Sequence, residues 1–302
     1  MNVLISGATG LIGTALSKAL NDRGDKAIAL VRPSSANVDG ATAAWDPAAE
    51  MIDVKAIDAL SVDAVVHLAG AGIADRRWNP QRKTEILESR TKATALLAGA
   101  IAGLDHAPRV FVSGSAIGIY GNRGDEILTE ESSSGNGFLA DVCLQWEAAA
   151  DEAARAGIRT VIARTGIVLA REGGALAKQL PLFRAGIGGR LGSGSQWTSW
   201  ITLADEVRAL LALLDDKRFS GSVNLTAPSP VTNKDFTKAL GHAVHRPTFF
   251  PVPPVALKIA LGAELVDEAL LASQRVSPTR LVEHGFSFHD PDIASAFASL
   301  LR

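Results

Sequence analysis

The sequence is poor in several features that would narrow its function. Its 302 residues include one cysteine, Cys143, which excludes an internal disulfide and a cysteine-based metal site and fits a reducing cytoplasm. No apolar run approaches the roughly 18 residues of a membrane span. No basic segment precedes an apolar core at the N-terminus, so we expect no signal peptide. The net charge of −2 gives no electrostatic reason to expect nucleic acid or an anionic membrane as a partner.

Closely spaced glycines follow the first apolar run of the chain. Residues 3–5 are typical of a strand buried on both faces, and helical spacing of apolar residues begins at Leu11. Gly7 allows a sharp turn, Gly10 lets a pyrophosphate approach the backbone, and Gly13 lets the helix lie close to the sheet. Free N–H groups at the start of a helix favour an anion. We therefore predict a diphosphate site that comprises Gly7, Thr9, Gly10, Leu11, Ile12 and Gly13.

Strand and helix patterns alternate through the first half of the chain. Apolar runs predict strands at 2–6, 26–31, 63–67, 109–113 and 158–164. Helical spacing predicts helices at 11–23, 81–103 and 137–156, and a later helix and strand at 203–215 and 221–225. Such alternation is typical of an α/β fold, in which helices cover both faces of a doubly wound parallel sheet.

The end of the second predicted strand indicates which dinucleotide binds. A cofactor with a free ribose 2′-OH usually meets an acidic residue about 20 residues beyond the glycines, whereas an arginine suits a 2′-phosphate. This strand ends in Val31 and Arg32, and no carboxylate follows until Asp39. We therefore predict NADP(H) in preference to NAD(H), with Val31 and Arg32 as contacts. The alternative is that Arg32 is an ordinary surface arginine at a strand end.

Small residues follow the third predicted strand, where backbone can pass close to a flat ligand such as adenine and its ribose. We expect cofactor contacts from Leu68, Ala69 and Gly70. His67, which precedes them, is more simply a structural histidine than a catalytic base. On the helix that follows, Glu85 and Arg90 are candidates for the adenosine end of the cofactor.

The next strand ends in hydroxyl groups, and here the motifs resemble a known family. Ser113 and Ser115 are followed by Tyr120-Gly121, and later segments at 164–168, 199–205 and 224–225 occur in the same order as motifs of the extended short-chain dehydrogenase/reductase superfamily. That superfamily includes sugar-nucleotide epimerases and dehydratases. The resemblance implies a Rossmann-type fold and adds Ser113 and Val168 to the expected cofactor contacts.

The C-terminal part resembles one branch of this superfamily, whose members are usually labelled "epimerase family protein" and have no settled substrate. The similarity lies at 274–281 and 285–288, and also at 77–78 and 145–147. After Gly166 the composition changes: residues 171–200 are rich in Gly, Ser and Arg, and most of the prolines lie near the end of the chain. We expect residues 1–168 and 201–226 to form the NADP(H)-binding Rossmann domain. Residues 169–200 and 227–302 are expected to form a smaller, mostly helical lobe.

One motif that the resemblance implies is absent. The superfamily uses a Tyr-x-x-x-Lys pair, in which the tyrosine transfers a proton and the lysine lowers the tyrosine pKa and binds the nicotinamide ribose. The single tyrosine here, Tyr120, is followed four residues later by Gly124. The corresponding positions of the helix predicted at 137–156 hold Leu139 and Cys143. Leucine cannot ionise, and a helical thiol would need help to do so.

Three interpretations remain open. In the first, the protein is an NADP(H)-dependent oxidoreductase or epimerase that acts on a carbonyl or carbinol of an unknown small molecule; Ser115 binds the substrate oxygen, and Tyr120 or Asp141 transfers the proton. Packing at the base of a loop is the alternative role for Tyr120. In the second, the protein is a non-catalytic NADP(H)-dependent regulatory or binding module. In the third, the cofactor is only structural.

Other candidate residues have simple structural explanations. Cys143 is more simply a packed thiol than a nucleophile. His242 and His245 have a spacing compatible with a metal, but no acidic or cysteine cluster accompanies them, so we expect no metal site. Trp197 and Trp200 either line a pocket between the lobes or pack the lobes together. The oligomeric state stays open between monomer and homodimer.

Overall fold

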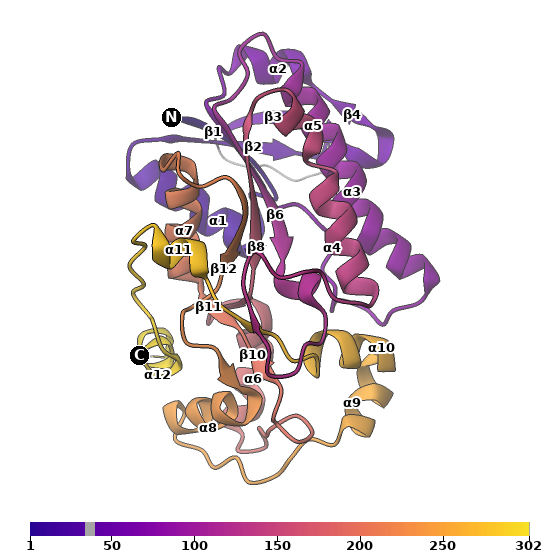
Figure 1. The fold of residues 1–302 in the computed structure, drawn as a ribbon, viewed down its shortest axis with the longest axis vertical. Helices are drawn as coiled ribbons and strands as arrows, with labels where there is room; N and C mark the ends of the chain where they lie inside the picture. Colours follow the sequence, from indigo (N-terminus) through magenta and orange to yellow (C-terminus); the bar gives the residue numbers. More distant parts are fainter. Residues whose placement is uncertain (34–39, 302) are drawn as a thin grey trace.

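An eight-stranded sheet runs through the upper part of the computed structural model (Figure 1), which describes residues 1–33 and 40–301. Asp39 therefore lies outside the described residues. The strand order is β12-β8-β6-β5-β1-β2-β3-β4. All neighbours are parallel except β3 and β4. The strands are β1 (Asn2–Ser6), β2 (Lys26–Val31), β3 (Ala41–Asp46), β4 (Met51–Ile52), β5 (Ala64–His67), β6 (Val110–Ala116), β8 (Arg159–Thr165) and β12 (Gly221–Leu225).

Helices cover both faces of this sheet, as predicted (Figure 1). On one face α1 (Leu11–Asp22) and α7 (Leu203–Asp215) pack in a core with Leu16, Leu210 and the facing strand residues. The other face buries Leu97 and Phe111 in a second core. The helices there are α2 (Val54–Ala59), α3 (Pro80–Ala102), α4 (Phe138–Ala148) and α5 (Asp151–Arg155). Because both faces are covered, the central strands β1, β5 and β6 are almost wholly buried. The predicted Rossmann-type sheet is confirmed.

Two local features differ from the sequence prediction. The single helix expected at 137–156 is two helices, α4 and α5, with the division at Ala149 and Ala150. Apolar spacing continues across the division, so the pattern does not reveal it. Strand β3 was not predicted, because its residues Ala-Thr-Ala-Ala-Trp-Asp include three alanines, which are depleted in strands. Pairing with β2 imposes the extended conformation there.

A smaller, mostly helical region lies below the large sheet (Figure 1). Its core includes Trp200, Phe236 and Phe297. Its helices are α6 (Gly174–Arg184), α8 (Asn233–Ala243), α9 (Pro254–Leu261), α10 (Ala263–Leu265) and α12 (Ile293–Leu300), and its short strands are β9 (Ile167–Leu169), β10 (Trp197–Thr198), β11 (Trp200–Thr202) and β13 (Val231–Thr232). A short π-helix, η3 (Val266–Leu270), follows α10. Within residues 1–33 and 40–301, no helix combines the length and apolar character needed to cross a bilayer.

The C-terminal segment returns from this lobe to the edge of the large sheet. Strand β14 (Arg275–Val276) pairs with β7 (Ile127–Leu128), and α11 (Thr279–Glu283) then lies beside β12. The Arg280 guanidinium donates to the carbonyl oxygens of Ser220 (2.8 Å) and Ser222 (2.9 Å) on the free side of β12. The Glu130 carboxylate accepts from the backbone N–H of Asn224 (3.1 Å) on the same side. Side chains thus occupy part of the hydrogen-bonding edge of the last strand.

Candidate cofactor-binding site

The turn from β1 into α1 is built around glycines. Gly7 has φ of +72°, and a Cβ at this position would lie 2.9 Å from the carbonyl carbon of Leu68. A Cβ on Gly13 would lie 2.2 Å from the Gly7 carbonyl oxygen, so the start of α1 is packed directly against the turn. Gly10, the N-cap of α1, supplies no side-chain acceptor for the first N–H groups of the helix. Those N–H groups are available to an anion.

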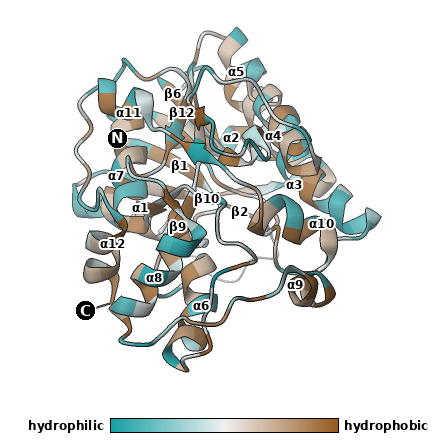
Figure 2. Cartoon of the chain, turned by 60° about the horizontal axis from the view of Figure 1, so that its bottom comes forward, coloured by the Kyte–Doolittle hydropathy of each residue, from teal (hydrophilic) through white to brown (hydrophobic). Residues whose placement is uncertain are grey.

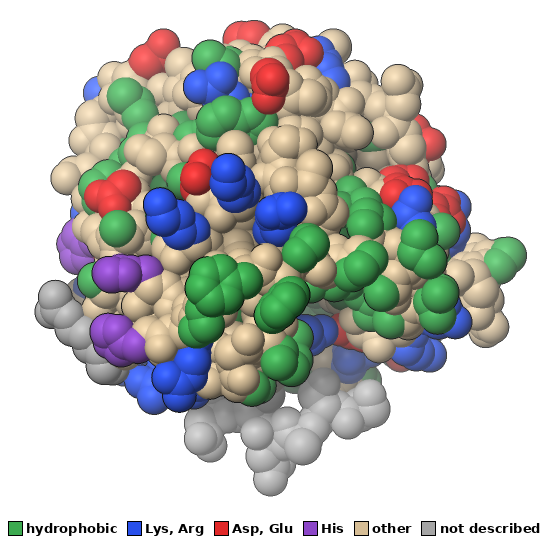
Figure 3. All heavy atoms as spheres, turned by 90° about the horizontal axis from the view of Figure 1, so that it is seen from below, with side chains coloured by type: hydrophobic (Ala, Val, Ile, Leu, Met, Phe, Trp, Pro, Cys, Tyr) green, Lys and Arg blue, Asp and Glu red, His purple; other side chains and the backbone are tan. Residues whose placement is uncertain are grey.

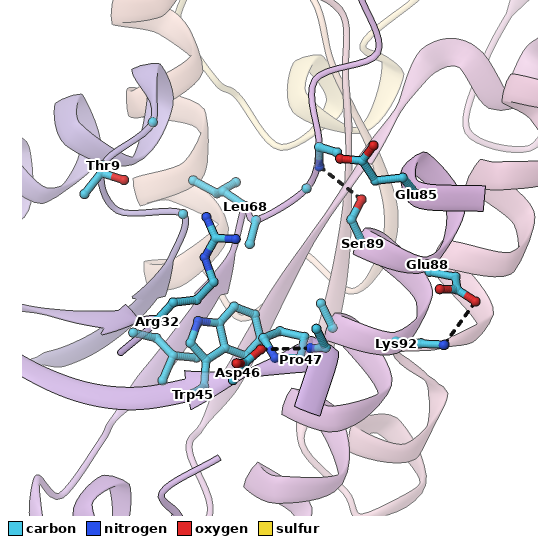
Figure 4. Close-up of a pocket in the computed structure, with 18 of the residues that line it drawn as sticks. Thr9, Arg32, Trp45, Asp46, Pro47, Leu68, Glu85, Glu88, Ser89 and Lys92 are labelled. Atoms are coloured by element: carbon cyan, nitrogen blue, oxygen red, sulfur yellow. Dashed lines mark hydrogen bonds and ion pairs between the residues drawn. The ribbon is translucent and has the colours of Figure 1, made fainter. Parts of the chain in front are cut away.

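A cleft of about 730 Å³ opens above this turn at the carboxyl ends of β1, β2, β3 and β5. The cleft lies at the switch point of the doubly wound sheet. From β1 the chain first builds the sheet outward through β2 and β3, and it then builds the other side through β5, β6 and β8. Figure 4 shows the Arg32 side chain extending past Trp45 toward Leu68, with Thr9 across the opening. Volume and position both suit a nucleotide-sized ligand.

Four cations line this cleft, and they differ in their partners. Arg82 lies 2.7 Å and Arg76 lies 3.4 Å from the Glu85 carboxylate. Lys92 pairs with Glu88 at 3.0 Å. For Arg32, by contrast, no hydrogen bond or ion pair occurs within the part of the chain that the structure describes. Arg32 is therefore the cation in the cleft wall whose charge is available to a ligand.

The cleft gathers most of the predicted cofactor contacts. Its lining includes Gly7, Thr9, Gly10, Val31, Arg32, Leu68, Ala69, Gly70 and Glu85. Leu11, Ile12 and Gly13 continue from it as the first turn of α1. Arg90, Ser113 and Val168 do not line it. The lining also includes residues that were not predicted: Trp45 and Asp46 from the end of β3, Ala48 just beyond it, and Ser89 and Lys92 from α3. The sequence signal that could have indicated Trp45 and Asp46 is an aromatic and an acidic residue directly before a proline, at 45–47.

Arg90 supports the wall of the cleft from behind. Its Nη1 donates to the carbonyl oxygens of Ala71 and Ile86, both at 3.0 Å. Its guanidinium lies 5.1 Å from the Trp146 ring, and a Cβ on Gly70 would lie 3.3 Å from its Cζ. Burial lowers the pKa of Arg90 from its ordinary value. The geometry makes Arg90 a support for the loop that carries Gly70 and Ala71.

His67 is fully buried behind the glycine turn. Its Nδ1 lies 2.5 Å from the Ser6 hydroxyl, and the Trp45 ring packs edge-on against it. Burial, assisted by the positive charge of Arg90, lowers the pKa of His67 to about 3. A neutral, enclosed imidazole fits the structural role predicted from the sequence.

Ser115 belongs to a buried hydrogen-bonded cluster at the end of β6. Its hydroxyl donates to Glu147 Oε1 at 2.6 Å. The Arg164 guanidinium grips the same carboxylate through Nε and Nη2, both at 2.8 Å. Burial alone would lower the pKa of Arg164, but the Glu147 carboxylate raises the pKa of Arg164 above its ordinary value. Ser113 is fully buried, and among the described residues its hydroxyl reaches only the Gly114 carbonyl oxygen, at 3.4 Å.

Tyr120 lies in the protein core. Its side chain is fully buried, and its hydroxyl donates to Asn224 Oδ1 at 2.7 Å and accepts from Arg164 Nη1 at 3.1 Å. Burial raises the pKa of this phenol. Both hydrogen-bonding directions are used inside the protein, so the position of Tyr120 fits the packing alternative and does not present its hydroxyl to a substrate.

The start of α4 lacks an acid–base group of the expected kind. Leu139 and Cys143 occupy the positions considered for a Tyr–Lys pair, and burial raises the pKa of the Cys143 thiol to about 12. The Glu268 carboxylate, from η3, accepts from the backbone N–H groups of Phe138 (3.1 Å) and Leu139 (2.8 Å). Through Glu268, the small lobe therefore caps the N-terminus of α4. Asp141 is exposed on the first turn of this helix.

The remaining candidates take structural positions. Trp200 is fully buried in the core of the small lobe. Trp197 donates to Asp125 Oδ1 at 2.8 Å and stacks against Arg275 at 4.3 Å. His242 is exposed on α8, and among the described residues no group of three His, Cys, Asp or Glu side chains is placed to hold a metal ion.

A doubly wound sheet with a glycine turn and a nucleotide-sized cleft at its switch point defines a Rossmann-type nucleotide-binding protein. Comparison with known proteins refines this class. The family model described as "NAD dependent epimerase/dehydratase family" matches residues 3–225, and a "Domain of unknown function (DUF1731)" matches residues 252–300. The chain belongs to the NAD dependent epimerase/dehydratase family.

Individual relatives match almost the full length of the chain. An epimerase family protein of Mycobacterium bovis, Mb2239, is 45% identical over 97% of this chain and 95% of its own. Human epimerase family protein SDR39U1 is 34% identical over the whole of both chains. The crystal structure of human SDR39U1 isoform 2 with NADPH has a TM-score of 0.88 at 32% identity, covering 100% of this chain and 99% of that chain. The fold and the family resemblance inferred from the sequence are confirmed.

Proposed function

We propose that this protein binds NADP(H) in the cleft above the glycine turn and uses it as an oxidoreductase or epimerase on a small molecule. The position of Arg32 carries the proposal, because its exposed guanidinium lines the cleft and is not engaged by a carboxylate among the described residues. A guanidinium can hold the 2′-phosphate that distinguishes NADP(H) from NAD(H). The NADPH complex of the similar human protein supports this choice.

The shape of the turn fits the rest of such a cofactor. The uncapped N–H groups at the start of α1 suit the pyrophosphate, and the missing side chain of Gly10 leaves room for it. Leu68 and the small residues Ala69 and Gly70 offer a wall for the adenosine. Arg90 holds that wall in place from behind through the Ala71 carbonyl oxygen.

The reaction assigned to this site is proton-coupled hydride transfer at a carbonyl or carbinol carbon. When bound, NADP(H) donates or accepts the hydride. Ser115 would orient the substrate oxygen. As an alcohol is oxidised, the Ser115 hydroxyl passes its proton to Glu147 and takes the substrate proton; reduction of a carbonyl reverses both transfers. Arg164 holds the Glu147 carboxylate toward Ser115.

A non-catalytic NADP(H)-dependent binding module is the second candidate. The observation that favours it is the composition of the start of α4, where Leu139 and the buried Cys143 supply no acid or base. Tyr120 is likewise enclosed. Under this proposal the cofactor binds tightly, but no carbonyl or alcohol is turned over.

Cofactor choice is tested by measuring the dissociation constants of NADPH and NADH for Arg32→Asp. A contact with a charged group contributes about 1.5–3 kcal/mol, and solvent screening of exposed Arg32 favours the lower end. We expect NADPH to bind about 10- to 50-fold more weakly, with NADH unchanged or improved. Arg155→Asp, an exposed arginine at the end of α5, is the matched control. An unchanged NADPH-to-NADH ratio would overturn the assignment.

Catalysis is tested by a screen of carbonyl and alcohol substrates, followed through NADPH absorbance. Ser115→Ala should lower turnover about 100-fold, because general acid–base groups contribute about 10²–10⁴-fold, and should leave NADPH affinity within about twofold. Tight NADPH binding without turnover of any substrate would favour the binding module.

A further inference from the structure

The underside of the small lobe exposes an apolar surface. Phe249 and Phe250 are 81% and 80% exposed, and Ile259 on α9 is 71% exposed. None of the eight residues of α9 is buried, and the helix is strongly hydrophobic in Figure 2. We call this surface the lower apolar patch; it consists of Leu182, Ile187, Phe249, Phe250, Val255 and Ile259. Monomeric soluble proteins rarely leave such clusters uncovered without a function.

The two parts of the sequence that supply the patch lie side by side. The loop after α6 runs beside the segment before α9, because the Val252 N–H donates to the Arg190 carbonyl oxygen (2.8 Å) and the Gly192 N–H donates to that of Val252 (3.0 Å). A Cβ on Gly189 would lie 1.9 Å from the Phe250 carbonyl oxygen. Figure 3, viewed from below, shows hydrophobic side chains extending across the middle and right of this face.

Basic side chains outnumber acidic ones around the patch. Segments 171–190 and 231–268, which supply the patch and the elements that adjoin α9, contain eight Lys and Arg and five Asp and Glu. One of these carboxylates, Asp267, pairs with Lys258 of α9 at 2.8 Å. Arg184 and Arg246 are exposed, and Arg246 donates to the Arg184 carbonyl oxygen at 3.0 Å. Within the described ranges, neither of them forms an ion pair with a carboxylate. Figure 3 shows Lys, Arg and His side chains on this face, with most acidic ones toward its rim.

We propose that the lower apolar patch and its basic surroundings bind the protein to an anionic lipid surface. Adjacent phenylalanines at a loop tip would enter the boundary between headgroups and acyl chains, while Arg184 and Arg246 meet lipid phosphates. The net charge of −2 gives no electrostatic reason to expect an anionic membrane, but attraction to a membrane depends on the charge of the face presented and not on the sum over the chain.

A second copy of this chain fits the patch less well than a membrane does. A twofold interface brings the same surface of each copy together. Two faces that each carry an excess of Lys and Arg over Asp and Glu would then repel each other. Charge complementarity therefore favours an anionic partner, and the high exposure of both phenylalanines favours a lipid surface.

The test is co-sedimentation of the full chain with phosphatidylcholine vesicles and with vesicles that contain 30% phosphatidylglycerol. We expect binding to the anionic vesicles that weakens at high salt. Phe249→Ser/Phe250→Ser should reduce this binding at least tenfold. Arg184→Glu/Arg246→Glu should remove the preference for anionic vesicles, because each basic residue at such a surface contributes about fivefold. Met51→Ser/Val282→Ser, at two exposed apolar residues of the sheet region, is the control that should leave binding unchanged.

Thermal melting of each variant checks that it is folded. Binding that is absent, equal on both vesicle types, or retained by the phenylalanine variant would overturn the proposal. Analytical ultracentrifugation of the chain without vesicles completes the test. A dimer that the phenylalanine variant dissociates, without vesicle binding by the original chain, would assign the patch to self-association instead.

Discussion

Replacing Gly13 by alanine would place a methyl group 2.2 Å from the Gly7 carbonyl oxygen and 2.8 Å from the Ala8 Cα. Both contacts are with backbone, which cannot rotate away as a side chain can. The clash is relieved only if α1 moves away from the turn. Overpacking of this kind costs about 1–3 kcal/mol, and a rigid backbone neighbour favours the upper end. Alanine is better than glycine in a helix by about 1 kcal/mol, so the net destabilisation is about 2 kcal/mol.

For a chain of 302 residues, that loss should lower the melting temperature by about 3 °C. Gly10→Ala is the matched comparison, because its Cβ would lie 3.2 Å from the Gly7 carbonyl oxygen and its φ of −76° suits alanine. We expect Gly10→Ala to melt within about 2 °C of the original chain and yet to bind NADPH at least tenfold more weakly, since its methyl group occupies the approach of the pyrophosphate.

Differential scanning calorimetry and NADPH titration of both variants make the test. Gly13→Ala should lose both stability and affinity, whereas Gly10→Ala should lose affinity alone. If Gly13→Ala melts at or above the temperature of the original chain, helix propensity has outweighed the clash. The account of Gly13 as the contact point between α1 and the turn would then be wrong.

Three further predictions concern buried charges. Folding holds the pKa of His67 at about 3, below its unfolded value, so His67 should cost about 1.4 kcal/mol of stability per pH unit as pH falls from about 6.5; urea unfolding at pH 4–7 should show a flatter profile for His67→Asn. Burial raises the pKa of Glu206 to about 8, so its stabilising effect is complete below about pH 4.5 and is lost as pH rises toward 8. Glu206→Gln should therefore change little at pH 4.5 and stabilise the fold at pH 8, and an equal effect at both values would refute this. Arg164→Met leaves the Glu147 carboxylate buried without its partner and should cost about 3–5 kcal/mol in the same assay, whereas adding Glu147→Gln should recover part of the loss.

Local sequence predicted the elements that carry the glycine turn. Strands β1, β2 and β12 and helix α7 have the predicted bounds, because their apolar residues repeat at the period of the element that they form. The end of β3 was missed, although it contributes Trp45 and Asp46 to the cleft. Its alanine-rich sequence has little strand preference of its own, and the neighbouring strand determines its conformation.

The surroundings of the candidate catalytic residues depend on contacts between distant parts of the chain. Ser115 was correctly placed at the end of a strand, but its partner Glu147 lies on α4, and the partner of Glu147, Arg164, lies on β8. Tyr120 was a candidate for proton transfer because it lies just beyond the motif of Ser113 and Ser115. Its hydroxyl instead meets Asn224, which is 104 positions away along the chain. No spacing rule in the sequence relates such residues.

The contacts of Arg280 and Glu130 along β12 bear on whether this edge strand can pair with another chain. An edge strand with free N–H and C=O groups is a template for pairing with another chain. Arg280 occupies the carbonyl oxygens of Ser220 and Ser222, and Glu130 occupies the N–H of Asn224. A chain cut before α11 would lose the first of these covers and expose that part of the edge. We therefore expect the segment that returns from the small lobe to hinder aggregation through edge-to-edge strand pairing.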